Sequence, residues 1–130
     1  RDVELTIEKS ERFVWIMSNQ VLMSTLPILE EAVARGVEFR LILPKGLKPP
    51  PGFRPIPDEL GRVDRKVLNE VGVVLVVSEK KGHVSFPRVD GSFDYAGFGV
   101  TSSRGLKWCK DLFAHYWRVA EPGRPRGYPP

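Results

Sequence analysis

Residues 13–44 constrain the fold of this chain more than any other stretch. They open with Phe13–Met17, a nearly continuous apolar run rich in aromatic and β-branched residues. They close with a second largely apolar run, Val37–Leu43, which Pro44 stops. Runs of this kind are typical of strands buried on both faces, as in a sheet that helices cover.

The segment between these two runs has the pattern of one amphipathic helix. We expect Ser18 or Asn19 to cap its first turn, and Arg35 followed by Gly36 is typical of a helix end. Strand, helix and strand within 32 residues predict a right-handed βαβ unit. The apolar residues of the helix recur at spacings of three and four, and they are Leu22, Leu26, Leu29, Ala32 and Val33.

Residues 45–57 differ sharply in composition, since they contain five prolines and two glycines. Neither a helix nor an inner strand tolerates that density of proline, so we expect a long surface loop with polyproline character. A stiff connector is one role for such a loop. A lid or a dimer arm is the other, because long loops in compact domains often carry function.

The rest of the chain is expected to extend the sheet that the βαβ unit begins. Its patterns predict a helix over Asp64–Val71, a buried strand over Val73–Val77, and a hairpin whose further strands cover 83–89 and 93–101. A closing helix follows, capped by Ser102 or Ser103, and its apolar residues recur at helical spacing. Together these elements predict an α/β fold with a mixed sheet flanked by helices.

Length and composition indicate one domain. The chain has 130 residues, of which 42% are hydrophobic, and we expect residues 1–122 to form the domain and 123–130 a disordered tail. There is no apolar run long enough to span a bilayer and no signal-peptide pattern. The lone Cys109 offers neither a disulfide framework nor a metal site, so we expect a cytoplasmic protein without metal or cofactor.

The predicted hairpin contains a spacing that resembles the signature of the phospholipase-D superfamily, His-x-Lys, four residues, Asp, six residues, Gly-Ser. His83, Asp90 and Gly97 match this signature in position, whereas Ser85 stands at the lysine position and Phe98 at the final serine. In that family the histidine attacks a phosphodiester phosphorus and the lysine stabilises the phosphoryl oxygens. Because a serine supplies only a neutral hydrogen bond, the resemblance implies a phospholipase-D-like half that has lost catalysis, and so no enzyme.

The closing helix carries a second resemblance. Residues 105–122, with their Trp-Cys, Leu-Phe, Tyr-Trp and Ala-Glu-Pro elements, are similar to the last helix of a family of archaeal transcription regulators, and the stretches 7–18 and 34–37 look like the same family. TrmB-type sugar-sensing regulators are more distant relatives. The resemblance covers residues 1–122 and implies a non-catalytic phospholipase-D-like domain that senses an effector and forms a homodimer. It also implies DNA binding through an N-terminal winged helix-turn-helix domain, which we expect to be missing here because the chain begins at Arg1.

A ligand of an open α/β sheet is expected beyond the carboxyl ends of the strands. Ser18–Asn19, Pro44–Lys45 and Ser78–Glu79 follow predicted strands, and Ser102, Ser103 and Arg104 join them if the last strand runs parallel to the first. Helix N-termini and an arginine favour an anionic or hydroxyl-rich effector. The candidate ligand-binding residues are Ser18, Asn19, His83, Ser85, Asp90, Tyr95, Ser102 and Arg104.

The sequence therefore leaves three functional hypotheses open. The first is a sensor and dimerisation domain of a transcription regulator, which the resemblances favour. The second is a phosphodiesterase or nuclease assembled from two chains. The third is a nucleic-acid-binding module that uses basic residues of the loop and tail, in a chain with a formal net charge of +4.

Overall fold

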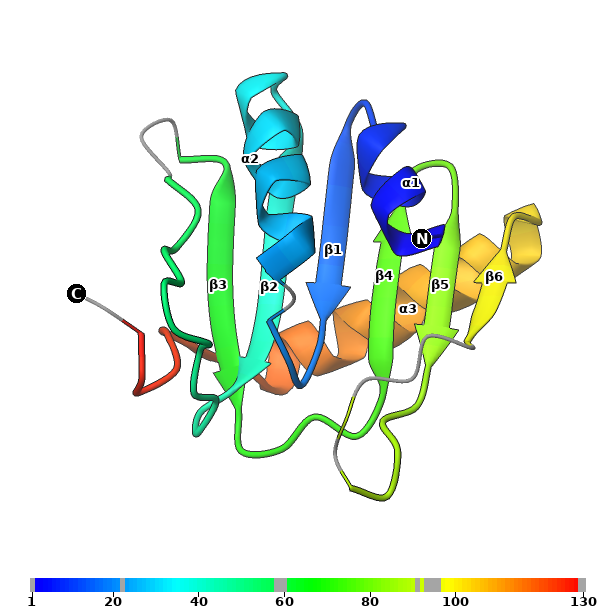
Figure 1. Ribbon diagram of the computed structural model, residues 1–130. Helices are drawn as coiled ribbons and strands as arrows, with labels where there is room; N and C mark the ends of the chain where they lie inside the picture. Colours follow the sequence, from blue (N-terminus) through cyan, green and yellow to red (C-terminus); the bar gives the residue numbers. More distant parts are fainter. Residues whose placement is uncertain (1, 22, 58–60, 91, 93–96, 129–130) are drawn as a thin grey trace.

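The computed structural model describes residues 2–21, 23–57, 61–90, 92 and 97–128, and within them the chain forms one mixed sheet with helices on both faces (Figure 1). The sheet order is β6-β5-β4-β1-β2-β3-β7. The strands are β1 Phe13–Met17, β2 Glu38–Pro44, β3 Val63–Leu68, β4 Val74–Ser78, β5 Gly82–Ser85, β6 Phe98–Val100 and β7 Glu121–Pro122. The helices are α1 Asp2–Glu8, the 3₁₀ turn η1 Met23–Thr25, α2 Leu26–Ala34 and α3 Ser103–Val119.

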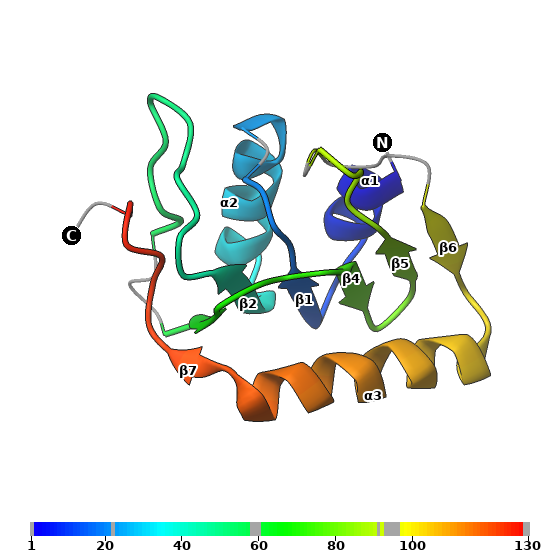
Figure 2. The same cartoon turned by 90° about the horizontal axis from the view of Figure 1, so that it is seen from below.

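The helices divide the core into two layers. Helices α1 and α2 lie on one face of the sheet, and α3 crosses the other face diagonally (Figures 1 and 2). Side chains alternate between these faces along each strand, as they must in a pleated sheet. Ile7, Val14 and Phe39 belong to the α1–α2 layer, whereas Leu75 and Phe113 belong to the α3 layer. The predicted α/β class, with a mixed sheet flanked by helices, is confirmed.

The predicted βαβ unit is confirmed, because β1 and β2 pair in parallel and α2 connects them. The start of the helix was predicted wrongly. Its N-cap is Thr25, without a side-chain cap bond, and Pro27 occupies the first turn, where a missing N–H costs nothing. Ser18 instead exchanges hydrogen bonds with the backbone of Gln20, whose oxygen accepts at 3.0 Å. Neither Ser18 nor Asn19 therefore caps the helix.

The helix predicted over Asp64–Val71 is also wrong, because this segment contains the strand β3. β3 pairs with β2 in parallel, with Leu41 opposite Arg65. Val63 and Val67 are buried, whereas Asp64 between them is exposed. The spacing of the apolar residues suited a helix, but hydrogen bonding to the open edge of β2 outweighs that local preference.

The predicted hairpin is confirmed as β4 and β5, which pair antiparallel. However, β4 also runs antiparallel to β1, with Val14 opposite Ser78. Ser78–Glu79 therefore lies at the amino end of β1, not at its carboxyl end as predicted. Within the predicted strand 93–101, the structure has β6 at Phe98–Val100. Residues 93–96 lie outside the described part of the chain.

Residues 123–128, which we expected to be disordered, contact the proline-rich loop. β7 joins β3 just before this segment, and the Gly123 backbone N–H then donates to the Arg65 carbonyl at 3.3 Å. The Arg126 N–H donates to the Lys45 carbonyl at 2.9 Å. Lys45 also forms an ion pair with Glu121 at 3.0 Å. The loop and the end of the chain thus support each other beside the sheet.

Candidate functional site

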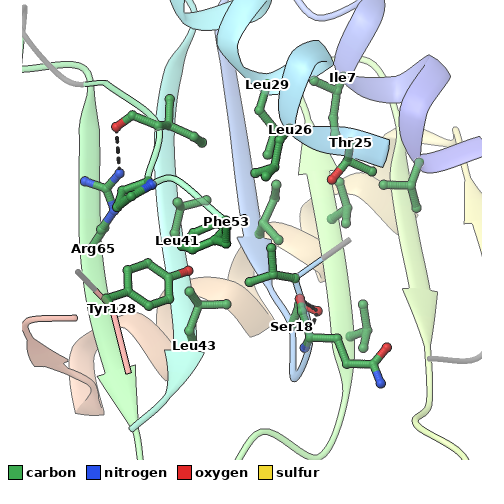
Figure 3. Close-up of a pocket in the computed structure, with 18 residues that line it drawn as sticks. Ile7, Ser18, Thr25, Leu26, Leu29, Leu41, Leu43, Phe53, Arg65 and Tyr128 are labelled. Carbon is green, nitrogen blue, oxygen red and sulfur yellow. Dashed lines mark hydrogen bonds between the residues drawn. The ribbon is translucent and has the colours of Figure 1, made fainter. Parts of the chain in front are cut away.

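An apolar pocket opens on the α1–α2 face of the sheet (Figure 3). About 80 Å³ of space inside it can be reached by the centre of a water-sized molecule. Leu41 and Leu43 of β2 form part of its floor, and Leu26 and Leu29 of α2 form part of its wall. Alternation along β2 places both leucines on the same face, two residues apart, under the helix.

The proline-rich loop and the tail supply the opposite wall of the pocket. The ring of Phe53 packs against the ring of Tyr128, with centroids 4.8 Å apart, and we call this pair the aromatic clasp. A methyl group added at Gly127 would lie 3.1 Å from Pro49 and 3.2 Å from the Leu47 carbonyl oxygen, so the backbones of tail and loop approach closely. The loop is therefore a wall of the pocket, which favours the lid-like role over that of a simple connector.

Few polar groups line the pocket, and those with described bonds are turned to the protein itself. Arg65 Nη2 donates to the carbonyl oxygen of Ile56 at 3.0 Å and so fixes the loop (Figure 3). Ser18 Oγ bonds the backbone of Gln20. Burial raises the pKa of Tyr128 to about 12, against the opposing effects of Arg65 and Arg124, so its phenol stays neutral. The lining thus has the chemistry of an apolar site.

Helix α1 contributes to the same pocket. Val3 and Ile7 lie on its inner side and line the cavity, together with Val76 of β4. Ile7 is 1% exposed, so α1 is firmly packed on the sheet. A molecule in the pocket would therefore touch the first helix of the chain as well as α2.

Of the predicted ligand residues, Ser18 alone among those described lines the pocket. It follows β1 and so lies at the carboxyl end of that strand, while its role as a ligand-binding residue stays a prediction. Asn19 lies next to it but outside the lining. The predicted neighbour Ser78 is at the other end of the sheet, because β4 is reversed.

His83 and Ser85, which we call the motif pair, lie on the same face of the sheet as the pocket but are closed off from solvent. His83 pairs with Val76, and Ser85 pairs with Val74, across antiparallel strands, so all four side chains share the face that α1 covers. His83 is 3% exposed and Ser85 0%. The hydroxyl of Ser85 has no hydrogen-bond partner among the described residues. The motif pair therefore does not line the pocket, contrary to the prediction.

Gly97 closes over the motif pair. A methyl group added at this position would overlap the Ser85 Cβ and the Val84 carbonyl oxygen, and it would lie 3.0 Å from His83 Nε2. The glycine of the phospholipase-D-like spacing thus lies against the histidine. Its role here is close packing, which a larger residue could not provide.

Asp90 is an exposed turn residue. Its carboxylate accepts hydrogen bonds from the Ser92 N–H at 2.9 Å and from the Ser92 hydroxyl at 2.7 Å. These bonds hold the pKa of Asp90 below its usual value, with Arg88 adding to the effect against a small opposing effect of burial. The turn chemistry accounts for this residue, and nothing in the structure places it in the pocket. Tyr95 lies outside the described residues.

Ser102 and Arg104 lie at the opposite edge of the sheet from the pocket mouth. β6 runs antiparallel to β5, with Val100 opposite Gly82, so α3 begins near the amino end of β1. Ser102 caps α3 by accepting a hydrogen bond from the Gly105 N–H at 3.0 Å, and Arg104 is exposed. The condition for including them in the site, a last strand parallel to the first, is not met.

Sequence reasoning missed the residues that form the wall and floor of the pocket. Phe53 and Tyr128 are the aromatic residues of two proline-rich stretches, and an aromatic residue in such a stretch was the signal that could have identified them. Arg65 was missed because its strand was predicted as a helix. Leu41 and Leu43 were assigned to a strand buried on both faces, where no cavity was expected.

Two features are absent from the described part of the chain. Within the described residues, no three His, Cys, Asp or Glu side chains lie close enough to hold one ion. Nor does any helix in that part of the chain have the length and apolar character needed to cross a bilayer. Cys109 is a buried free thiol whose pKa is raised by burial.

Comparison of sequences yields no relative: no protein-family model matches, and no curated protein matches. Comparison of structures yields proteins with a similar fold. TrmBL2, described as an archaeal chromatin protein with a novel mode of DNA binding, superposes with a TM-score of 0.75 at 18% identity over 94% of this chain and 48% of that one. The chain thus spans about half the length of TrmBL2.

Two further solved structures share the fold as well. Nuc from Salmonella typhimurium, a phospholipase D family member, gives a TM-score of 0.67 at 7% identity, over 94% of this chain and 88% of that one. NucT from Helicobacter pylori gives 0.68 at 8% identity, over 94% and 89%. The chain therefore has a phospholipase-D-like α/β fold, which it shares with an archaeal TrmB-like protein.

Proposed function

We propose that this chain is a non-catalytic ligand-sensing and dimerisation domain of an archaeal transcriptional regulator. The observation that carries the proposal is that the phospholipase-D-like fold here has an open apolar pocket and a closed motif pair on one face. A sensor needs the first, and a phosphodiesterase could not work with the second.

The closed motif pair supports the absence of catalysis. A histidine can attack phosphorus only if the substrate reaches its ring, and His83 is 3% exposed. The charge that develops on the phosphoryl oxygens also needs a cation, and the serine at that position supplies none. Both the access and the charge required for phosphodiester cleavage are missing at this pair.

The contact between the pocket and α1 supports sensing. Val3 and Ile7 line the pocket from the first helix of the chain. A ligand that binds them differently in two arrangements of α1 would shift the balance between those arrangements. TrmBL2, in which this fold makes up about half of the chain, is described as a DNA-binding protein. By analogy, a DNA-binding domain attached before α1 would receive the signal.

We include a homodimer and a cytoplasmic location in the proposal. Regulators that read two-fold symmetric DNA sites commonly pair as two-fold dimers. Analytical ultracentrifugation at micromolar concentration is expected to give about 29 kDa, twice the 14.7 kDa of one chain. A mass near 15 kDa would remove dimerisation from the proposal.

The test of the regulator assignment is the parent gene together with an activity assay. We expect a basic winged-helix pattern within about 100 residues upstream of Arg1, the size of one small domain. We also expect no cleavage of bis(p-nitrophenyl) phosphate. Turnover by the wild-type chain that disappears in His83→Ala would overturn the proposal in favour of a phosphodiesterase.

A further inference from the structure

We infer that the apolar pocket binds an uncharged apolar small molecule and that the aromatic clasp closes over it. The inference rests on the proposed sensing function and names the chemical class of its ligand, which differs from the anionic or hydroxyl-rich effector that the sequence suggested. Its basis is the composition of the walls, the state of the polar groups, and the way in which loop and tail are joined.

The walls would leave the hydroxyl groups of a sugar without partners. Leucine, isoleucine and valine side chains from α1, α2 and three strands, together with Val21 and Ile56, make up most of the lining. Each sugar hydroxyl buried against such a surface would lose its hydrogen bonds to water without replacement. An apolar molecule loses no such bonds, and the release of water from the leucine surfaces favours its binding.

The polar groups of the lining whose bonds are described hold the protein itself. Arg65 uses Nη2 to hold the Ile56 carbonyl. Ser18 is engaged with the Gln20 backbone. Tyr128 stays neutral, since burial raises its pKa to about 12. These bonds anchor the loop beside the apolar walls.

The aromatic clasp provides a closure that depends on two distant segments. Phe53 comes from the proline-rich loop and Tyr128 from the end of the chain, and each lines the pocket. The Arg126–Lys45 backbone bond and the close fit of Gly127 hold the two segments together. A ligand that packs on both rings would stabilise their contact, so binding and closure are coupled.

The experiment is a fluorescence titration of the 130-residue chain with N-phenyl-1-naphthylamine, an uncharged apolar compound. We expect saturable binding of one molecule per chain with enhanced emission. Val21→Trp fills the pocket, which Val21 lines from the rim, and is expected to weaken binding about tenfold or more. Val119→Trp is the matched control, because Val119 lies on α3 and is 59% exposed. It is expected to change the affinity less than about twofold.

Leu26→Phe is a second variant that fills the pocket. It replaces Val21→Trp in the titration if circular dichroism shows that Val21→Trp does not fold. Tyr128→Ala opens the clasp and is expected to weaken binding about threefold to tenfold. Equal binding by both filling variants and by Val119→Trp would overturn the inference, because the compound would then bind elsewhere.

Thermal-shift measurements with maltose and with inorganic phosphate separate this inference from the proposed function. If either compound stabilises the chain and Val21→Trp abolishes the effect, the pocket senses a polar ligand: the inference fails and the sensing function stands. If neither compound nor N-phenyl-1-naphthylamine binds, the inference fails and the sensing role falls with it. Dimerisation is then judged by the ultracentrifuge alone.

Discussion

The apolar pocket and the motif pair occupy one face of one sheet, yet they have opposite properties. The pocket is open and lined by leucine, isoleucine and valine, whereas His83 and Ser85 are polar and almost completely buried. Both lie against α1, which contributes Ile7 to the pocket wall and also contacts β5. The polar side chains of the motif pair are thus buried, whereas the accessible pocket on this face is lined mainly by apolar side chains.

This difference separates fold from function. The hairpin that carries the phospholipase-D-like spacing is present here, and Gly97 lies against His83. What differs is the environment: a serine replaces the lysine, and the pair is inaccessible to a substrate. The same scaffold gains an accessible cavity near β2, where the loop and the tail enclose it. Function follows from these local features and not from the fold.

The largest expected effect comes from restoring the lysine of the signature. Ser85→Lys would place an ammonium group at a position that is 0% exposed, and leaving that charge buried and unpaired is expected to cost about 3 kcal/mol or more. Urea denaturation followed by circular dichroism measures the free energy of unfolding.

Ser85→Ala is the matched control for that variant. It is expected to change the free energy of unfolding by less than about 1 kcal/mol, because the hydroxyl has no hydrogen-bond partner among the described residues. If Ser85→Lys were as stable as the wild type and also cleaved a phosphodiester, the motif pair would be open to substrate and the contrast between the two regions would disappear.

The second effect concerns the open region. Tyr128→Ala removes a ring that packs 4.8 Å from the ring of Phe53, and we expect a loss of about 2 kcal/mol from the lost aromatic pair and the lost apolar burial. Tyr128→Phe keeps the ring and is expected to match the wild type. Thermal unfolding of the two variants measures the difference. Equal stability of Tyr128→Ala and the wild type would show that the clasp does not hold the loop.

The third effect involves Glu79, which binds the segment that leads from α1 into β1. Burial by itself raises the pKa of this carboxyl, but hydrogen bonds from the backbone N–H groups of Glu11, Phe13 and Arg12 outweigh it, so the pKa lies below its usual value. Their lengths are 2.9, 3.2 and 3.1 Å in that order. Ionised Glu79 therefore stabilises the fold above its unfolded pKa, and this stabilisation is lost as the pH falls through the folded pKa.

Glu79→Gln is expected to lower the free energy of unfolding at pH 7 by about 1 kcal/mol, since these bonds are partly exposed and screened. It should also reduce the loss of stability between about pH 5 and pH 3. Glu70→Gln, at an exposed position, serves as the control. A pH profile of Glu79→Gln parallel to that of the wild type would contradict the assigned role.

The smallest effect lies outside both regions. Ser102→Ala removes the cap of α3 and is expected to cost about 0.5 kcal/mol while leaving N-phenyl-1-naphthylamine binding unchanged. Ser103→Ala, within the first turn, is the control. If Ser102→Ala changed the affinity of the pocket, the edge of the sheet where α3 begins would have to be coupled to it.

The parts of the fold that could be predicted are those that a short segment determines by itself. The βαβ unit follows from local apolar runs and a positive-φ glycine, Gly36. The strand β3 could not be predicted, because three consecutive charged residues separate Val63 from Val67 and leave no alternating apolar pattern. The segment acquires its structure from pairing with β2. The reversal of β4 could not be read from Val73–Val77 either, since a fully apolar strand fits the sheet in both directions.

The candidate site shows the same limit. The place of Ser18 in the pocket lining follows from its position directly after β1, at the carboxyl end of a central strand. Phe53 and Tyr128 could not, because proline-rich segments have no periodicity and their contact joins residues far apart in the chain. His83 and Ser85 were predicted from spacing, and spacing does not report that α1 would cover them.

The central claim is that the accessible site is the apolar pocket and not the motif pair. Two-dimensional amide NMR of the chain during titration with N-phenyl-1-naphthylamine tests it most directly. We expect chemical-shift changes at Leu41, Phe53 and Tyr128, with His83 and Ser85 unaffected. Changes concentrated at His83 and Ser85, with the pocket residues unaffected, would contradict the claim.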